Sequence, residues 1–249
     1  MNINAAIKIF LKIIAPVRYI VEKIVYKFFL NRYNNWDLLE KYKNQTINVI
    51  ANGPSLNKTN FKSFEGPCIG MNKINLIFEK KDWHPDMIVC INGLVISQNK
   101  EFFNKTEIVL LLPVKAFFLG IRKRKNIIFF NLKSENKFSL NFRSFVGVSA
   151  TVTFTALQLS YFLNPIKVNI YGLDHNFKIN DKPHKIEKLH GDDEFHFDPN
   201  YFKDQFWGLP DLRVSELGYE LAKNIFKKNN IEILDCTVDG KCKVFKKQG

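Results

Sequence analysis

Hydrophobic residues in this chain gather in short uninterrupted runs, separated by polar stretches or by segments with helical spacing. Short apolar runs without alternation are typical of strands buried on both faces of a parallel sheet. The runs cover residues 46–51, 67–70, 86–91, 107–112, 126–130, 168–171 and 231–234. Helical spacing over 147–163 and 211–229, with a short helix after Trp36, completes an alternation of strands and helices. The pattern therefore predicts an α/β fold of Rossmann-like type, a mostly parallel sheet with helices on both faces.

Two later segments carry more detailed expectations. In the helix over 211–229, four apolar positions are expected to face the core. They are Leu217, Leu221, Ala222 and Ile225. Residues 176–208 form a long polar stretch without clear periodicity, which predicts a loop. Since this loop follows a strand, we expect it to act as a lid over a site at the strand end.

The amino-terminal segment, residues 1–35, is predicted to form a separate unit built on a basic amphipathic helix over 5–30, ahead of a catalytic domain over 36–249. Charged residues interrupt it too often for a membrane-spanning helix, which needs roughly 20 apolar residues. The apolar face holds Ile9, Ile13, Ile20, Ile24 and Phe28, and Lys8, Lys12, Lys23 and Lys27 lie largely on other faces. Such a helix favours an anionic membrane surface, and therefore a peripheral location on the cytoplasmic face of the inner membrane. Packing on the domain or on a partner subunit is the alternative.

Composition narrows the partners but not the reaction. The chain has 249 residues with a net charge of +13, which favours anionic partners, although part of this charge reflects a general bias towards Lys, Asn, Ile and Phe. The basic residues are scattered rather than clustered with exposed aromatics, so a nucleic-acid-binding protein ranks last. The four cysteines form no Cys-x-x-Cys pair and no His cluster accompanies them, which indicates a reducing compartment without a structural zinc site.

Candidate chemistry lies at the strand ends. The first strand ends in Asn52-Gly53-Pro54-Ser55-Leu56, a turn that can present bare backbone N–H groups to a phosphate or nucleotide. Gly53 lets a ligand approach the main chain, Pro54 fixes the exit angle, and Ser55 is suited to cap the next helix. The next strands end in Asn72, in Asn92-Gly93, and in Gly172 followed by Asp174. Gly147 and Ser149 are expected to open a helix, a further place for phosphate. Each of these residues also has an ordinary use in a turn or cap.

As an ordered set these residues resemble a known family. The set is Asn52-Gly53-Pro54-Ser55-Leu56, Gly70-Met71-Asn72, Asn92, Gly147-Val148-Ser149 and Ile170-Tyr171-Gly172-Leu173-Asp174. It resembles the bacterial sialyltransferases of glycosyltransferase family 42, and also the related 6-hydroxymethylpterin pyrophosphokinase-like group. The second group is favoured at the carboxyl end by Phe195-His196-Phe197, Tyr201-Phe202, 207–211, 235–241 and Val244-Phe245. The resemblance covers roughly residues 46–245.

The resemblance implies a Rossmann-like nucleotide pocket and a transferase that needs no metal cofactor. The implied nucleotide-binding residues are Asn52, Gly53, Asn72, Asn92, Ser149, Gly172 and Asp174, to which the turn adds Pro54 and Ser55. The implied donor is a cytidine monophosphate sugar, and a histidine acts as general base. His196 is the first candidate for this base, His190 and His175 compete with it, and His184 ranks lower.

The chain departs from the sialyltransferases where that family places tyrosines on the leaving phosphate. Asn176 and Phe177 stand there, and Tyr201, Arg143 or Arg213 are possible substitutes. This departure puts the sialic-acid donor itself in question.

Two enzyme functions that transfer different chemical groups therefore remain open. The first is a glycosyltransferase that passes a sugar from a nucleotide donor to a glycan or glycolipid acceptor, in cell-surface polysaccharide or lipooligosaccharide synthesis. The second is a pterin pyrophosphokinase, which would use ATP and Mg²⁺ and would need carboxylates near the phosphates. The adjacent Asp192, Asp193 and Glu194 are its candidates. Either enzyme is compatible with a homo-oligomer.

Overall fold

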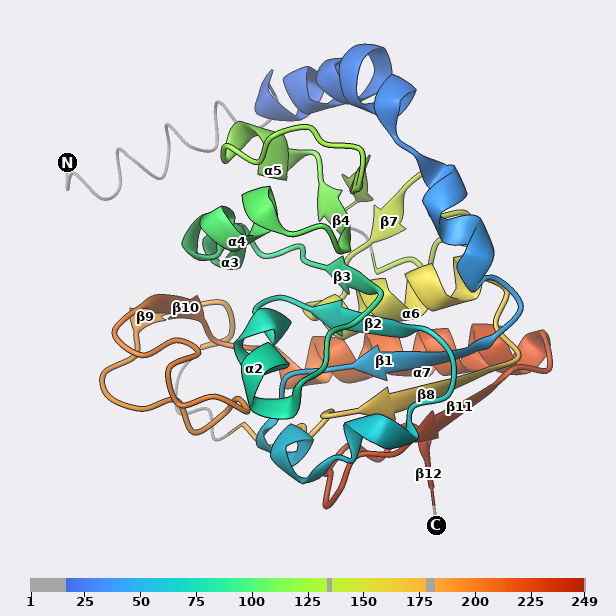
Figure 1. Ribbon diagram of the computed structural model, residues 1–249, viewed down its shortest axis with the longest axis vertical. Helices are drawn as coiled ribbons and strands as arrows, with labels where there is room; N and C mark the ends of the chain where they lie inside the picture. Colours follow the sequence, from blue (N-terminus) through green and yellow to red (C-terminus); the bar gives the residue numbers. More distant parts are fainter. Residues whose placement is uncertain (1–16, 134–135, 178–181, 249) are drawn as a thin grey trace.

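The structure is a computed structural model that describes residues 17–133, 136–177 and 182–248. Its centre, in this described part, is an eight-stranded sheet in which all paired neighbours run parallel (Figure 1). The strand order is β12-β11-β8-β1-β2-β3-β4-β5. The strands are β1 (Thr46–Ile50), β2 (Cys68–Met71), β3 (Met87–Val89), β4 (Val109–Pro113), β5 (Ile127–Phe130), β8 (Lys167–Tyr171), β11 (Glu232–Asp235) and β12 (Lys246–Lys247). The predicted α/β class with a mostly parallel sheet is therefore confirmed.

The strand order reverses between β1 and β8. The chain builds β1 to β5 outward in one direction, then returns to β8 on the other side of β1 and continues to β11 and β12. At such a reversal the connections leave the sheet on opposite sides, so a crevice opens outside the carboxyl ends of the two strands. The fold thus places the turns after β1 and β8 at the point where open α/β sheets bind ligands.

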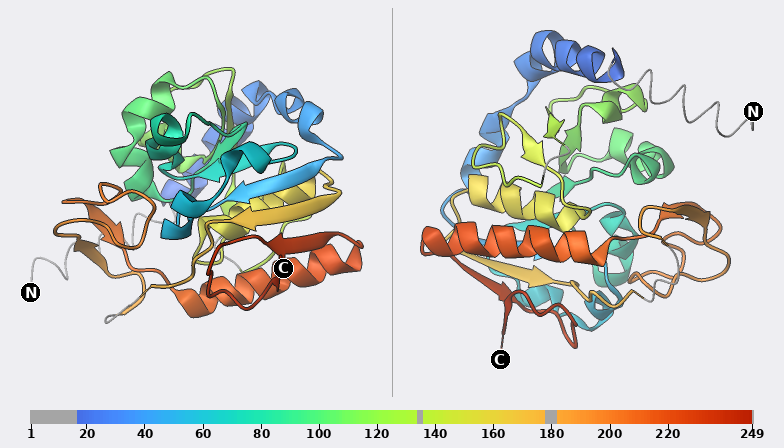
Figure 2. Two further views of the ribbon diagram at one scale, coloured as in Figure 1. Left: turned by 60° about the horizontal axis from the view of Figure 1, so that its bottom comes forward. Right: turned by 180° about the vertical axis from the view of Figure 1, so that it is seen from behind.

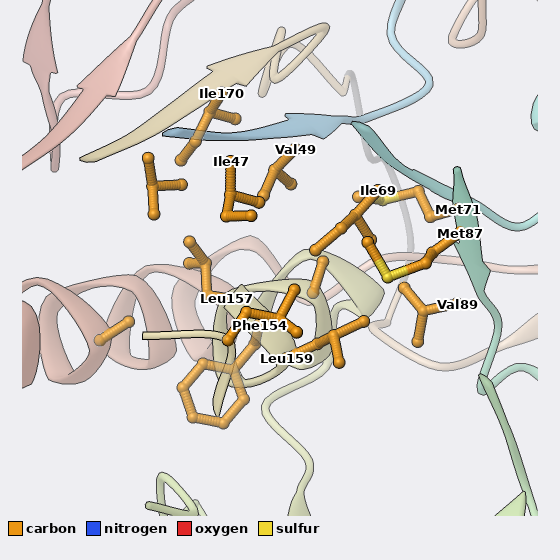
Figure 3. Packing of buried hydrophobic residues seen from close by; sticks show 14 of the residues in the cluster. Ile47, Val49, Ile69, Met71, Met87, Val89, Phe154, Leu157, Leu159 and Ile170 are labelled. Atoms are coloured by element: carbon orange, nitrogen blue, oxygen red, sulfur yellow. The ribbon is translucent and has the colours of Figure 1, made fainter. Parts of the chain in front are cut away.

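Both faces of the sheet are buried because successive strand residues point to opposite sides. On β1, Val49 belongs to one apolar cluster and Ile50 to the other. Helices α6 (Val152–Phe162) and α7 (Leu212–Lys228) cover the first face, where Phe154 and Leu157 of α6 lie under the strands (Figure 3). The second face is covered by short helices: η6 (Ile74–Ile77), α2 (Phe78–Lys81), α3 (Gly93–Gln98), α4 (Lys100–Lys105) and α5 (Lys115–Phe118). The right-hand view of Figure 2, seen from behind, shows the two long helices side by side in front of the sheet.

Two details of the predicted helices are wrong. The first helix begins at Val152 rather than at 147, because Val146–Gly147 forms strand β7, which pairs with β6 (Leu132–Lys133). In α7, Ala222 is buried and Leu221 and Ile225 pack against the core as expected, but Leu217 is 55 % exposed. The neighbouring Gly218 takes the buried position instead, because it packs directly on Ser149: a Cβ at 218 would lie 2.5 Å from the Ser149 hydroxyl oxygen.

The segment predicted as a polar loop contains a small core of its own. Strands β9 (Ile186–Lys188) and β10 (Phe206–Gly208) pair antiparallel, and they appear in orange beyond the carboxyl ends of the sheet strands (Figure 1). Three aromatic side chains between these strands, Phe197, Tyr201 and Phe202, are buried together with Trp207 of β10. We call residues 182–208 the strap.

The described part of the amino-terminal segment packs on the domain by one narrow strip. Residues 17–25 are helical, followed by η1 (Tyr26–Leu30), η2 (Asn31–Tyr33) and η3 (Trp36–Tyr42). Tyr26 and Leu30 are buried in the second cluster. The other half of the predicted helix, with Lys8, Ile9, Lys12 and Ile13, lies outside the described residues. Among the residues described, no helix is both long enough and apolar enough to cross a membrane.

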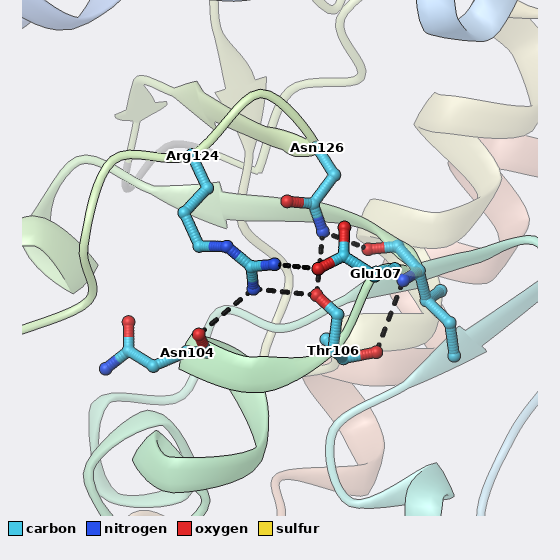
Figure 4. Close-up of polar contacts among 6 residues, drawn as sticks. Asn104, Thr106, Glu107, Arg124 and Asn126 are labelled. Atoms are coloured by element: carbon cyan, nitrogen blue, oxygen red, sulfur yellow. Dashed lines mark hydrogen bonds and ion pairs between the residues drawn. The ribbon is translucent and has the colours of Figure 1, made fainter.

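Polar contacts fix the opposite end of the sheet, where β4 and β5 begin. Arg124 donates to the carbonyls of Asn104 and Thr106 at 3.0 and 2.8 Å and pairs with Glu107 (Figure 4). Asn126 donates to the carbonyls of Thr106 and Ile108 at 3.0 and 2.8 Å. These two side chains precede β5 and satisfy carbonyls that precede β4, so they tie the starts of the two strands together.

Candidate active site

A cavity of about 630 Å³ opens at the carboxyl ends of β8, β1, β2 and β3, at the strand-order reversal. Ten residues singled out from the sequence line it. They are Asn52, Gly53, Pro54, Asn72, Asn92, Gly172, Asp174, His175, His184 and His196. The structure therefore brings most of the predicted nucleotide pocket and three of the candidate histidines to one place.

Asp174, after β8, holds the turn after β1. Its carboxylate accepts the Ser55 backbone N–H at 3.1 Å and the Ser55 hydroxyl at 2.6 Å. Ser55 itself is buried and does not line the cavity, so Asp174 rather than Ser55 satisfies the start of η4 (Pro54–Lys58). Burial raises the pKa of Asp174, although the bonds from Ser55 oppose this shift. Each carboxylate oxygen keeps a lone pair that a ligand hydroxyl can use.

Three asparagines supply amide groups at successive strand ends. Asn52 donates to the Met71 carbonyl at 3.1 Å, and its own side-chain oxygen is buried with no partner among the described residues. The side-chain oxygen of Asn72 is likewise buried without a partner in this part of the chain, and Asn72 has a left-handed backbone, with φ +53°. Asn92 caps α3 by accepting from Leu94 N–H at 2.9 Å. The three asparagines thus place neutral amide groups along one wall of the cavity, where such groups can donate to or accept from a ligand.

His196 is oriented by a buried carboxylate. Its Nδ1 lies 2.8 Å from Oδ2 of Asp193, and the two side chains are 12 % and 1 % exposed. Asp193 also accepts the Phe195 N–H at 2.9 Å, so a local turn brings His196 onto the carboxylate. A carboxylate only accepts, so the proton sits on Nδ1 and the lone pair of Nε2 remains available in the cavity wall. Sequence reasoning missed this role of Asp193, and the Asp-x-x-His spacing was the signal for it.

Aromatic rings hold the imidazole in place. The His196 ring stacks on Tyr201, with 4.1 Å between centroids and 6° between planes, and meets the edge of Phe202. Tyr201 is fully buried, and its hydroxyl accepts the Lys73 N–H at 3.2 Å. The Lys73 ammonium donates to the Tyr201 carbonyl and to Gln205, both at 2.7 Å. Burial lowers the pKa of Lys73 to about 8, while the nearby Asp193 opposes the shift.

The strap is tied to the strand ends as well as to itself. Phe197 N–H donates to the Asn52 carbonyl at 3.0 Å, and the Asn57 amide donates to the Phe197 carbonyl at 2.8 Å. Phe177 and Trp207 both stack on Phe195, with centroids 5.6 and 5.5 Å away, and lie 6.5 Å from each other. These three rings line the cavity, and the indole N–H of Trp207 is buried with no partner among the described residues. The strap is thus a packed wall beside His196.

The amino terminus of α6 forms another part of the wall. Thr151 caps the helix by accepting from Thr153 N–H at 3.2 Å, and the preceding Ala150 has φ +52°, an uncommon conformation for a residue with a Cβ. Thr151, Val152 and Thr153 line the cavity. Of the described lining residues, none is Lys or Arg. Any phosphate bound here would therefore rely on helix-start N–H groups and on histidine.

Besides Ser55, five other residues predicted for the site lie away from the cavity wall. Ser149 is buried, and its hydroxyl donates to the Val214 carbonyl at 2.7 Å. Tyr201 lies beneath His196, and Arg143 stacks near Trp36 and Phe162 and pairs with Glu40. The remaining two, Arg213 and His190, are exposed and do not line the cavity.

The acidic run of the strap does not converge on one point. Asp192 pairs with Lys203 at 2.8 Å, Asp193 holds His196, and Glu194 lines the cavity. Among the described residues, no three His, Cys, Asp or Glu side chains are grouped so that they could hold a metal ion. Asp174 and Glu194 are the acidic residues on the described wall, and they replace Asp192 and Asp193 as the carboxylates that could meet a Mg²⁺–phosphate in the kinase alternative.

Comparison with known proteins adds little to what the geometry of the site shows about function. Neither a protein-family model nor a curated protein sequence matches this chain. One solved structure with a similar fold is the MAf glycosyltransferase from Magnetospirillum magneticum AMB-1, with a TM-score of 0.49 and 10 % sequence identity. The match covers 89 % of this chain but 38 % of that chain. A likeness at this level is too low to assign a function.

Proposed function

We propose that this chain is a glycosyltransferase that moves a sugar from a nucleotide donor to a hydroxyl of a surface glycan or glycolipid. The observation that carries the proposal is the His196–Asp193 pair, in which a buried carboxylate engages Nδ1 of a histidine that lines a cavity at the switch point of the sheet. A neutral imidazole in this tautomer is the group that a reaction at a sugar hydroxyl requires. Because the His196 ring is stacked on Tyr201, it loses little conformational entropy when the transition state forms.

The donor is proposed to be a cytidine monophosphate sugar of the sialic-acid type. Support comes from Asn52, Asn72 and Asn92, which line the cavity at successive strand ends and carry neutral amide groups of the kind that bind a cytosine or ribose. Asp174 is proposed to accept ribose hydroxyls, as acidic residues do after strands in dinucleotide-binding folds. Asn92 would contribute through its amide N–H₂ group, since its oxygen already caps α3.

The proposed reaction is a displacement at the anomeric carbon. Nε2 of His196 takes the proton of the acceptor hydroxyl while the oxygen attacks the anomeric carbon. The bond between that carbon and the phosphate oxygen breaks, and the nucleoside monophosphate leaves with the electron pair. The imidazolium that forms is stabilised by Asp193.

The leaving phosphate is proposed to sit at the amino terminus of α6. Thr151, Val152 and Thr153 at this terminus line the cavity, and the helix dipole favours an anion. His175 lies on the same wall and bonds Glu216 at 3.0 Å. Arg143 and Arg213 have no part in this arrangement, because neither lines the cavity.

A ligand screen tests the proposal against the pyrophosphokinase alternative. Melting temperature is measured with CMP, CDP, UDP, GDP and ATP, each with and without Mg²⁺, since a ligand that binds the folded state raises it. We expect CMP to stabilise the protein without a divalent ion. Stabilisation by ATP with Mg²⁺ alone would favour the kinase. Sugar transfer from a CMP-sugar to a glycolipid acceptor is the confirming assay.

A further inference from the structure

The helical segment 17–33 leaves most of its apolar side chains in solvent. Tyr26 and Leu30 are buried against the domain, but eight other apolar or aromatic side chains are 41–62 % exposed. They are Val17, Tyr19, Ile20, Val21, Ile24, Phe28, Phe29 and Tyr33. Figure 1 shows the segment as a blue arm at the top of the molecule, with little of the fold around it. Contiguous exposed apolar surface of this kind marks an interaction site.

A second element from the catalytic domain lies beside this arm. The Lys123 ammonium sits over the rings of Phe29 and Tyr33, 5.4 and 2.7 Å from their centroids. The ring of Phe117 in α5 lies 5.8 Å from that of Phe29, and the adjacent Phe118 is 50 % exposed. The loop 121–125 therefore belongs to the same face as the arm, although the two are far apart in the sequence.

The charges on this face have one sign. The arm and the loop carry eight basic residues and one acid, Glu22, which pairs with Arg18 at 2.9 Å, while Arg124 of the loop pairs with Glu107 outside both segments. The basic residues are Arg18, Lys23, Lys27, Arg32, Arg122, Lys123, Arg124 and Lys125. A second copy of the chain would bring like charges together on an isologous contact, which disfavours it. An anionic bilayer is complementary, because it takes apolar and aromatic side chains between its headgroups and attracts the surrounding lysines.

We infer that helix 17–33, α5 and loop 121–125 form one docking surface for an anionic lipid bilayer. Because the loop and α5 are part of the catalytic domain, the surface fixes the orientation of that domain on the membrane instead of tethering it by the arm alone. The inference goes beyond the proposed transfer reaction and does not depend on it.

Vesicle flotation of the full-length protein, without substrate, tests the inference. The vesicles contain phosphatidylcholine alone or mixed with phosphatidylglycerol. The paired variant Arg122→Gln/Lys125→Gln removes two exposed charges of the loop, and Lys227→Gln/Lys228→Gln removes two exposed charges at the end of α7 as a matched control. Each basic residue at an anionic surface contributes roughly fivefold, so we expect the loop pair to weaken binding about 25-fold and the control to change it little.

A second variant separates the apolar part from the charge. Ile24→Ser/Phe28→Ser is expected to reduce binding to the anionic vesicles even in high salt, where charge is screened. Melting temperature checks that each variant is folded. The inference is overturned if neutral vesicles bind the protein as well as anionic ones, or if the loop pair binds like the control. It is also overturned if Ile24→Ser/Phe28→Ser converts a dimer to a monomer and leaves vesicle binding unchanged.

Discussion

A Cβ atom on Gly53 would lie 2.0 Å from Oδ2 of Asp174, a separation that no real side chain tolerates. The turn after β1 and the turn after β8 therefore interlock at a residue that must be glycine. The same carboxylate bonds Ser55, so one contact fixes both sides of the strand-order reversal. This relationship gives the Asn-Gly-Pro-Ser sequence a physical reason that its spacing alone does not reveal.

Replacing Gly53 with Ala should therefore damage the site. Asp174 must move away and lose its bonds to Ser55, at a cost of about 1–3 kcal/mol in the free energy of unfolding. Affinity for the nucleotide should fall as well. Gly208→Ala is the control, because Gly208 lines the same cavity with nothing within 4 Å of an added Cβ. Chemical denaturation and calorimetric titration with CMP measure both effects, and equal behaviour of the two variants would contradict the expectation.

Sequence patterns were sufficient for the sheet but not for the site. Each central strand appears within a residue or two of its expected place, because a strand buried on both faces needs an unbroken apolar run. Parallel strands end at the same edge of a sheet, so Asn52, Asn72 and Asn92, which follow three such strands, lie together at that edge. Which strands are neighbours, and hence the reversal beside β1, depends on long-range pairing that no local pattern encodes.

The strap shows where sequence reasoning fails. Its aromatic residues are irregularly spaced among polar ones, so it has neither a strand nor a helix period, yet Tyr201 and Trp207 are buried. Asp193 looked like part of a solvated acidic run or a metal site, and its tertiary context makes it the partner of His196. Likewise Arg143 was a candidate phosphate ligand by charge alone, and the fold turns it to Trp36 and Glu40.

The lowered pKa of Lys73 should make the stability of the protein depend on pH in the alkaline range. Its pKa is about 8 in the folded protein against an ordinary 10.5, so between these values the unfolded chain binds more protons than the folded one. This residue therefore adds stability as pH rises through that window, and its effect is constant outside it. The free energy of unfolding of the native protein, relative to Lys73→Met, should increase from about pH 8 towards pH 10.5. The exposed Lys62, replaced in the same way, is the surface control.

Asn34 is expected to stabilise the edge of the sheet. Its amide donates to the Phe129 carbonyl at 2.7 Å and its oxygen accepts the Phe129 N–H at 2.9 Å, so one side chain takes the place of a further strand beside β5. Asn34→Ala should lower the free energy of unfolding by about 1–3 kcal/mol, because both backbone groups lose their partner. The exposed neighbour Asn35 makes no capping bond, and Asn35→Ala should be nearly neutral in the same denaturation experiment.

Removing the proposed base should stop the chemistry and leave donor binding intact. His196→Ala is expected to lower kcat by about 10²- to 10⁴-fold, the usual contribution of a positioned base. Affinity for CMP should change little, because Nε2 faces the acceptor. His184→Ala replaces another histidine of the cavity and His190→Ala one outside it, and both should retain most activity. A full loss in either of these variants, beside an active His196→Ala, would move the base to that residue.

Asp193→Asn tests whether the carboxylate positions the imidazole. An asparagine of the same shape can donate its amide N–H to Nδ1, which shifts the ring proton to Nε2 and removes the lone pair from the cavity. We therefore expect kcat to fall by about 10²-fold or more while KM for the donor stays nearly constant. Nitrogen NMR of the imidazole should show the change of tautomer, a signature that a merely loosened fold would not produce. Asp192→Asn is the matched control, since Asp192 is adjacent in sequence and pairs with Lys203 at the surface. If Asp193→Asn keeps both the native tautomer and native turnover, then Asp193 has no part in catalysis and the bond to Nδ1 serves only to hold the strap.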